Sequence, residues 1–341
     1  MRIGWCCKWL PPPGDPRTAA AMNLRDTTVA AITRLAPAAA TEKLLGLVEA
    51  NMAALAAQVE EAASAPPLER CLRIISSVLP VYTHPVARPR YAEPALREAV
   101  ERGLVAIGAR ARAAGVRLSM HPGQFCLLAT DNARALENSI EELDYHTEVM
   151  RLLGLAGGWH PEGAHINIHG GARAPGIEGF RRGFARLSAE TQGLLTVEND
   201  ETSYGLDDLL PLAETLPVVL DLHHHWCHSG GEHIEPDDPR IARVRESWRG
   251  TRPMGHLSAP REGLLPGGLD PETLPDYAAL RAAGVPAREL RAHSERLWNR
   301  AINRWALRHL DWTDLEVEAK GKNLASHDLA EAGLASAAAS L

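Results

Sequence analysis

Short apolar segments with the composition of β-strands alternate with longer helical patterns along the whole chain, and this alternation limits the possible folds more than any other feature. The expected strands are residues 1–6, 71–77, 116–122, 165–171, 194–200, 217–225, 254–260 and 314–320. The expected helices are residues 41–63, 95–115, 132–154, 178–190, 205–215, 238–249, 287–310 and 323–340. Eight strand–helix units in 341 residues predict an α/β protein with one (β/α)8 barrel, the TIM-barrel fold.

The main structural alternative is a doubly wound open sheet. That fold carries a Gly-rich phosphate-binding turn after its first strand, whereas here the stretch WCCKWLPPPGDP, residues 5–16, offers mainly proline. No internal repeat or linker divides the sequence. We therefore expect a single domain over residues 1–341, with the barrel core in 1–322 and a C-terminal helix in 323–341.

Composition narrows the classes of function. No apolar run reaches the roughly 20 residues that cross a bilayer, and the N-terminal segment lacks the ordered parts of a signal peptide. We expect a cytoplasmic monomer without membrane contact. The five cysteines include no CxxC pair, which argues against a disulfide framework and a thiolate zinc site. The net charge of −7 weighs against a nucleic-acid partner unless the acidic side chains hold divalent cations.

Polar side chains recur at the ends of the expected strands, where a (β/α)8 barrel places its active site. The residues at or just after these ends are His84, His121, His169, Glu198, Asp221, His224, His256 and Glu318. One histidine at such a place is more often structural than functional. A whole rim of buried imidazoles and carboxylates is costly unless the groups are paired or bind metal. The pattern therefore predicts a divalent-metal cluster at the C-terminal ends of the strands.

The donor set indicates the type of metal. It combines imidazole and carboxylate without thiolate, which suits Mn²⁺, Zn²⁺ or Fe²⁺ better than Ca²⁺ or a structural zinc. Two or three ions roughly 3.5–4 Å apart would clamp the attacking and leaving oxygens in phosphate-ester hydrolysis. Glu316, Glu318 and Lys320 alternate onto one face of the last strand. Such residues could form a buried ion pair in the barrel interior instead of binding metal. The polar residues at the other strand ends favour metal binding by Glu318.

Several motifs in fixed order resemble the UV damage endonuclease family. They are RLSMHPGQF (117–125), HINIHGG (165–171), VENDE (197–201), LDLHHH (220–225), GHLS (255–258) and EVEAKGK (316–322). The resemblance implies a TIM barrel of the xylose-isomerase-like superfamily with a manganese cluster. It also implies a DNA repair endonuclease that uses metal-activated water to nick damaged double-stranded DNA 5′ of ultraviolet photoproducts and other distorting lesions.

The resemblance also assigns roles to individual residues. The implied metal ligands are His121, His169, Glu198, Asp221, His224, His256 and Glu318. The implied catalytic residues are His84, His256 and His293, with His293 expected on the helix after the seventh strand, and Lys320 is expected to hold a flanking phosphate. Gln124 and Phe125 match the pair that the family inserts into the duplex beside the lesion, and Arg173 is expected to contact phosphate.

Two positions depart from the family pattern. Met254 stands two residues before His256, where the family usually has a lysine that joins the metal site in modified form. A thioether cannot replace a bridging carboxylate, so the chain would hold fewer ions or take a ligand from elsewhere, such as Glu262. Phe125 stands where tyrosine is common and keeps the aromatic face for stacking.

The altered metal site keeps other functions open. A metal-dependent tailoring enzyme, either an oxidase or an isomerase, could use the same barrel. A sugar isomerase or epimerase would need a further lysine or carboxylate to move a proton or hydride. A binding protein without activity is the third alternative, and the intact set of Glu198, Asp221 and Glu318 argues against it.

The histidine run in LDLHHH requires a change of backbone geometry. In a regular strand Asp221, His223 and His225 would share one side and His224 would lie on the other. The resemblance selects Asp221 and His224 as ligands, which requires the strand to end or bulge near His223. His223 and His225 are then expected to support the ligands or to pack beside them.

Overall fold

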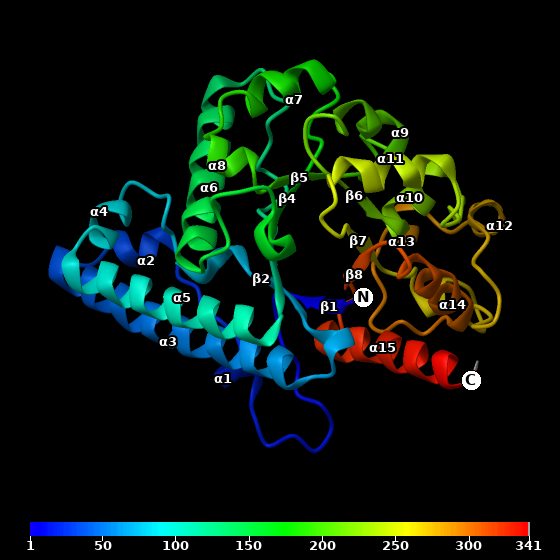
Figure 1. The fold of residues 1–341 in the computed structure, drawn as a ribbon, viewed down its shortest axis with the longest axis horizontal. Helices are drawn as coiled ribbons and strands as arrows, with labels where there is room; N and C mark the ends of the chain where they lie inside the picture. The colour runs from blue at the N-terminus through cyan, green and yellow to red at the C-terminus, as the bar shows by residue number, and fades with distance from the viewer. Residues whose placement is uncertain (340–341) are drawn as a thin grey trace.

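Eight short strands form a closed parallel barrel in the computed structural model, which describes residues 1–339 (Figure 1). The strands are β1 (Ile3–Cys6), β2 (Cys71–Ile74), β3 (Arg117–Met120), β4 (His165–His169), β5 (Leu195–Glu198), β6 (Val218–Asp221), β7 (Met254–Leu257) and β8 (Asp314–Val317). Each strand pairs with the next along the chain, and β8 pairs with β1 to close the barrel. The (β/α)8 barrel expected from the sequence is confirmed.

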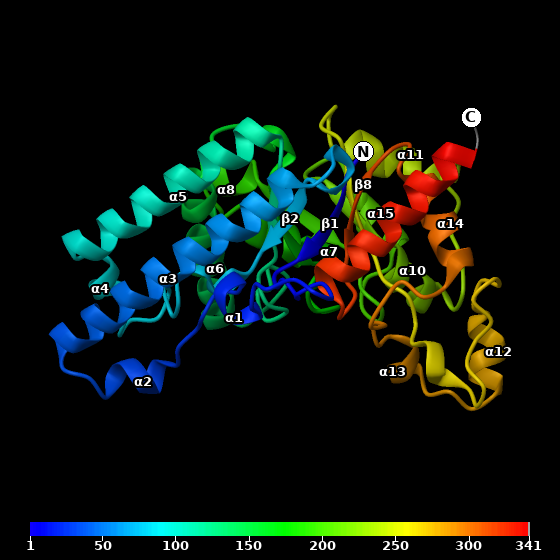
Figure 2. The same cartoon turned by 90° about the horizontal axis from the view of Figure 1, so that it is seen from below.

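Helices surround the barrel. They are α1 (Ala19–Met22), α2 (Val29–Thr33), α3 (Pro37–Ser64), α4 (Arg88–Tyr91), α5 (Pro94–Ala114), α6 (Ala133–Leu152), α7 (Gly176–Phe184), α8 (Ala189–Gln192), α9 (Leu206–Leu209), α10 (Leu222–Ser229), α11 (Pro239–Ser247), α12 (Tyr277–Ala282), α13 (Ala287–Leu290), α14 (Arg300–His309) and α15 (Lys322–Ala339). The long helices α3 and α5 lie side by side in both views, as Figure 2 shows from below. No helix among the described residues is long and apolar enough to cross a membrane.

Local sequence signals account for the boundaries of the long helices. Proline stands at the first position of α3 and α5, where its missing N–H costs nothing. Gly115 ends α5 with a φ of 67°, the left-handed conformation that glycine adopts without strain. The Asn132 side chain accepts the Ala135 N–H and so begins α6.

Three of the expected helices are divided in the structure. The helix expected over 287–310 consists of α13 and α14, the one over 178–190 of α7 and α8, and the one over 205–215 of α9 and a 3₁₀ turn, Leu210–Leu212. New N-caps cause two of these breaks, because the side chains of Asn299 and Ser188 accept backbone N–H groups of α14 and α8. Of the C-terminal helix expected over 323–341, residues 340–341 lie outside the described residues.

The end of the barrel where the strands begin is closed by a buried ion pair and by apolar side chains. Arg117 and Asp314 are the first residues of β3 and β8, and Arg117 Nη1 lies 2.9 Å from Asp314 Oδ2. Beside this pair Met254 is fully buried in a small apolar cluster that includes Val219 and Trp248. The polar strand ends described next therefore lie at the opposite opening.

Candidate metal centre

Eight of the side chains expected in the site meet at the C-terminal ends of the strands. They form three groups: His121, His169 and Glu198; Glu198, Asp221, His256 and Glu318; and His224, His293 and Glu318. Within each group the potential ligand atoms all lie within 4.8 Å of one another. Because Glu198 and Glu318 each belong to two groups, the three groups form one continuous centre, which we call the candidate metal centre.

The strand register explains why these residues meet. His169, Glu198 and Asp221 are the last residues of β4, β5 and β6. In the ladders His169 pairs with Glu198, and Asp221 pairs with His256 on β7. All strands of a parallel barrel end at the same opening, so side chains distant in sequence become neighbours there.

Glu198 is fully buried, and both of its carboxylate oxygens face imidazoles. Oε1 lies 2.9 Å from His256 Nδ1, and Oε2 lies 3.0 Å from His121 Nε2. The Asn167 amide also donates to Oε2. Burial alone would raise the pKa of Glu198, but the imidazoles of His256 and His169 hold it well below its usual value. Glu198 is therefore an anion at neutral pH.

His256 is surrounded by carboxylates. Nδ1 lies 3.3 Å from Glu318 Oε1, and Nε2 lies 3.4 Å from Glu316 Oε2. Burial opposes the charged form, but the Glu198 carboxylate outweighs it with help from Glu316, and the pKa of His256 rises to about 10. A divalent cation bound among these carboxylates would compete with that proton, as expected of an imidazole ligand.

Three buried atoms of the centre have no hydrogen-bond partner among the described residues: Asp221 Oδ2, His169 Nδ1 and His256 Nε2. Burial raises the pKa of Asp221 and lowers the pKa of His169. An unpaired buried polar atom costs free energy that a bound cation would recover. The unpaired atoms of Asp221 and His169 and the mixed oxygen–nitrogen donor set fit a divalent cation of the kind expected from the sequence.

The histidine run owes its geometry to Asp221. This residue ends β6, and its Oδ1 accepts the backbone N–H of His224 at 2.7 Å, which caps α10. The start of a helix turns His224 into the centre, where Nδ1 lies 3.3 Å from Glu198 Oε1. The prediction of a strand over 217–225 is therefore wrong after residue 221, because the aspartate is a better helix cap than a strand residue.

The two histidines on either side of His224 have different surroundings. The ring of His223 packs against His293, with 5.5 Å between ring centroids. His225 Nε2 lies 3.0 Å from Glu232 Oε2, and this pair is outside the three groups.

His293 is not on a helix, contrary to the sequence prediction. It lies in the irregular segment between α13 and α14, where it forms an antiparallel bridge with Pro260. The capping of α14 by Asn299 delays the helix and leaves residues 291–299 free to follow the barrel opening. This segment brings His293 to His224 and Glu318.

Two residues with expected catalytic roles lie outside the three groups. His84 follows β2 in a loop, and its Nδ1 accepts the Val86 N–H at 3.2 Å. Lys320 is half-exposed, with Nζ 3.2 Å from Glu295 Oε1. The structure therefore does not join either side chain to the candidate metal centre.

No substitute for the missing family lysine comes from the position that the sequence suggested. Glu262 is exposed in a 3₁₀ turn, Glu262–Leu264, and belongs to none of the three groups. Met254 is the first residue of β7. It lies in the apolar cluster at the end of the barrel where the strands begin, away from the candidate metal centre.

The three residues expected to contact DNA lie on loops that follow strands. Gln124 and Phe125 are exposed in the loop after β3. Phe125 is 73% exposed, the highest value for a large apolar side chain among the described residues. Arg173 follows β4, and its guanidinium donates to the Thr202 carbonyl at 3.2 Å. An aromatic ring held in water is unusual and suits a surface that stacks on a partner.

Several residues beneath the centre were missed by the sequence analysis. Arg73, Ser119 and Asn167 are buried inside the barrel. Arg73 contacts Glu316 and Glu318, the Ser119 hydroxyl donates to Glu316, and the Asn167 amide donates to Glu198. Arg73 interrupts the otherwise apolar strand CLRI, and Ser119 and Asn167 are polar residues in the interior of β3 and β4. A polar residue at an alternate strand position was the signal that could have found them.

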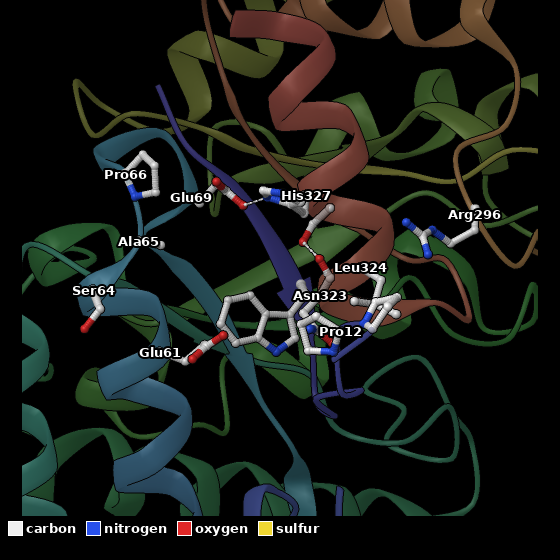
Figure 3. Close-up of a pocket in the computed structure, with 13 residues that line it drawn as sticks. Pro12, Glu61, Ser64, Ala65, Pro66, Glu69, Arg296, Asn323, Leu324 and His327 are labelled. Carbon is white, nitrogen blue, oxygen red and sulfur yellow. Dashed lines mark hydrogen bonds and ion pairs between the residues drawn. The ribbon is translucent and has the colours of Figure 1, made fainter. Parts of the chain in front are cut away.

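A separate cavity of about 540 Å³ lies on the flank of the barrel between the end of α3 and the start of α15 (Figure 3). Its walls include Trp5, Glu61 and Leu324, and His327 Nδ1 lies 2.9 Å from Glu69 Oε2 at its edge. None of its lining residues belongs to the candidate metal centre. This cavity is therefore distinct from the site expected from the sequence.

A closed (β/α)8 barrel with linked histidine and carboxylate groups at its C-terminal opening defines a class, the TIM-barrel proteins with a candidate multinuclear metal centre. A family model described as UV-endonuclease UvdE matches residues 15–338 of the chain. The chain belongs to this family.

Individual relatives agree with the family assignment. The chain is 33% identical over 209 residues to the "UV-damage endonuclease" of Neurospora crassa, a match that covers 58% of this chain and 31% of that protein. It is 29% identical over 271 residues to the "UV DNA damage endonuclease" of Bacillus cereus (strain B4264), covering 75% and 73% of the two chains. The chain thus spans about a third of the fungal protein.

A solved structure supports the fold. The structure titled "Crystal Structure of SacUVDE" aligns with all of this chain and all of its own, with a TM-score of 0.74 and 22% sequence identity. The two proteins therefore share the barrel architecture.

Proposed function

We propose that this protein is a metal-dependent DNA repair endonuclease that nicks one strand 5′ of ultraviolet photoproducts and other distorting lesions. The observation that carries the proposal is the continuous centre in which Glu198 and Glu318 each serve two groups of potential ligands. Membership of the UvdE family and the names of the relatives support a DNA substrate. The monomeric state and the cytoplasmic location stay predictions from the sequence.

The residues that would hold the cations are those of the three groups. Mn²⁺ suits this mixture of imidazole and carboxylate, with Zn²⁺ or Fe²⁺ as alternatives. The three groups offer places for two or three ions. When bound, such ions activate water for attack on phosphorus and neutralise the charge that develops on the phosphate.

The chain's own side chains would orient the reaction around the scissile phosphate. Hydrolysis adds a water oxygen to phosphorus and breaks the bond between phosphorus and the 3′-oxygen. We assign proton donation to the departing 3′-oxygen to a ring nitrogen of His293, because this imidazole is half-buried beside Glu318. Lys320, which is half-exposed just after β8, would exchange Glu295 for a phosphate next to the cut.

Lesion selection would rest on deformation of the duplex. A damaged step is cheaper to kink and unstack than an intact one, so a protein that inserts a side chain selects it without reading the bases. Phe125 and Gln124 would make this insertion, and the exposure of both side chains on the loop after β3 supports the proposal.

The Phe125→Ala variant is expected to nick irradiated DNA about tenfold more slowly, because stacking of a base on an aromatic ring contributes about 1–3 kcal/mol. Its thermal unfolding should be unchanged, since the ring is 73% exposed. Initial nicking rates at low DNA concentration measure the effect. Val105→Ala is the matched control, because Val105 is 53% exposed on α5 and should leave the rate unchanged. Equal rates for Phe125→Ala and the wild type would exclude the insertion role.

The experiment that tests the function compares irradiated and undamaged supercoiled plasmids incubated with the Mn²⁺-loaded protein. We expect nicked circles from the irradiated plasmid alone and no nicking after EDTA treatment. Primer extension on the nicked strand should place each cut 5′ of a photoproduct. Binding of Mn²⁺ without nicking of either plasmid would contradict the proposal and favour a tailoring enzyme on the same barrel.

A further inference from the structure

Arg73 lies directly under the candidate metal centre and is almost completely buried on β2. Its Nε lies 3.0 Å from Glu316 Oε2, and its Nη2 contacts Glu318 Oε1. The same Nη2 lies 2.6 Å from the Cys6 sulfur. One guanidinium therefore joins two carboxylates of β8 and the segment that follows it, and arginine keeps its charge at every pH of interest.

Glu316 is fully buried, and its carboxylate is contacted from three directions. Arg73 lies on one side, and the Ser119 hydroxyl donates to Oε1. On the third side is His256, which pairs with Glu316 in the ladder between β7 and β8 and places Nε2 3.4 Å from Oε2. Glu316 belongs to none of the three groups of potential ligands.

His256 thus stands between two sets of acceptors. Its Nδ1 faces Glu198 and Glu318, which belong to the centre, whereas its Nε2 faces Glu316, which does not. A neutral imidazole carries one N–H and one lone pair, and a ligand needs the lone pair on the side of the cation. An acceptor opposite the other nitrogen decides which tautomer forms.

We propose that Arg73 and Glu316 are positioning residues that fix His256 as a metal ligand through Nδ1. Glu316 Oε2, which lies 3.4 Å from Nε2 without a hydrogen bond to it, would accept the proton on Nε2 once a cation occupies the Nδ1 side, and Arg73 holds Glu316 at that place. The same guanidinium occupies Oε1 of Glu318 and leaves Oε2 for a cation. The identity of the cation rests on the proposed function. The choice of the His256 nitrogen rests only on the distances from Nδ1 to Glu198 and Glu318 and from Nε2 to Glu316.

The test measures Mn²⁺ binding to the full chain by calorimetry in the absence of DNA. Glu316→Gln is expected to lower the affinity of the centre by about 10- to 100-fold, the usual effect of removing a carboxylate that orients a histidine ligand. Asp314→Asn is the matched control, because Asp314 lies on the same strand, is equally buried and pairs with Arg117. It should destabilise the protein without changing Mn²⁺ affinity. An unchanged affinity in Glu316→Gln would overturn the proposal.

Two further measurements do not depend on that variant's folding. Nitrogen NMR of the imidazoles in the Zn²⁺-loaded wild type should show His256 protonated at Nε2, and a proton on Nδ1 would overturn the proposal. Arg73→Lys, which keeps the positive charge, should retain more of the Mn²⁺ affinity than Arg73→Gln. Equal affinities of these two variants and the wild type would count against a role for Arg73.

The outcomes separate this inference from the proposed function. A wild type that binds Mn²⁺ tightly and shows the Nε2 proton, but does not nick irradiated DNA, supports the inference and contradicts the function. Nicking of irradiated DNA together with a proton on Nδ1 of His256 would support the function and contradict the inference.

Discussion

Glu318→Gln is expected to reduce nicking of irradiated DNA by more than about 100-fold, because the effect should exceed that of removing a residue that only supports a ligand. Glu318 belongs to two of the three groups, so its loss weakens both places at once. Glutamine has the same size, but it offers one neutral oxygen and turns an N–H₂ group toward a cation or toward Arg73, which now contacts Oε1. Initial nicking rates and Mn²⁺ binding should fall together.

A control at an exposed carboxylate separates this effect from a general change of charge. Glu331 on α15 has a side chain that is 68% exposed and lies near His327, away from the candidate metal centre. Glu331→Gln should nick irradiated DNA at the wild-type rate. A Glu318→Gln protein that is folded by circular dichroism and still nicks at that rate would show that Glu318 is not a ligand.

Asp314→Asn is expected to lower the free energy of unfolding by about 3–5 kcal/mol, the usual result of removing one partner from a buried ion pair. Asp314 is fully buried, and its carboxylate pairs with Arg117 at 2.9 Å and Arg252 at 2.6 Å. Asparagine leaves the buried Arg117 guanidinium without a counter-charge. Urea unfolding followed by tryptophan fluorescence measures the difference. Asp311→Asn serves as the control, because Asp311 is exposed in the turn before β8 and should change stability little.

The pH dependence of this difference has a defined sign. Burial alone would raise the pKa of Asp314, but Arg117 and Arg252 hold it below its usual value of 3.8. The stabilisation is therefore complete above the unfolded pKa and is lost as the pH falls through the lower folded value. The gap between wild type and Asp314→Asn should be full at neutral pH and shrink below about pH 4. A gap that grows on acidification would contradict the assignment.

The architecture could be predicted because alternation and strand composition act over the whole chain. Each of the eight strands lies within an expected segment, although all eight are shorter than expected, since the pattern does not show where pairing stops. Six of the seven polar strand ends and the motif containing His293 also indicated the eight side chains of the candidate metal centre, because a closed parallel barrel brings every strand end to one opening.

The remaining features depended on whether a segment continues its strand or helix or is ended by a capping residue, and the hydrophobic periodicity does not show this. Asp221 could continue a strand or cap a helix, and only the packing of α10 decides between them. The segment 291–299 has helical composition, but Asn299 caps a later helix. The role of Arg73 could not be predicted, because a charged residue within an apolar strand can be interpreted only when its partners, Glu316 and Glu318, are known to face it.

The capping of α10 by Asp221 also bears on which cations the protein can accept. Because Asp221 Oδ1 accepts the His224 N–H, Oδ2 is the oxygen better placed for a cation, and the contact of Arg73 with Oε1 of Glu318 would favour Oε2 in the same way. Both carboxylates would therefore favour binding a cation through one oxygen. Ca²⁺ favours six to eight oxygens and often a bidentate carboxylate, at about 2.3–2.6 Å. A cation with a small coordination number and an affinity for imidazole would fit this centre better, so the hydrogen bond that starts α10 would also discriminate between metals.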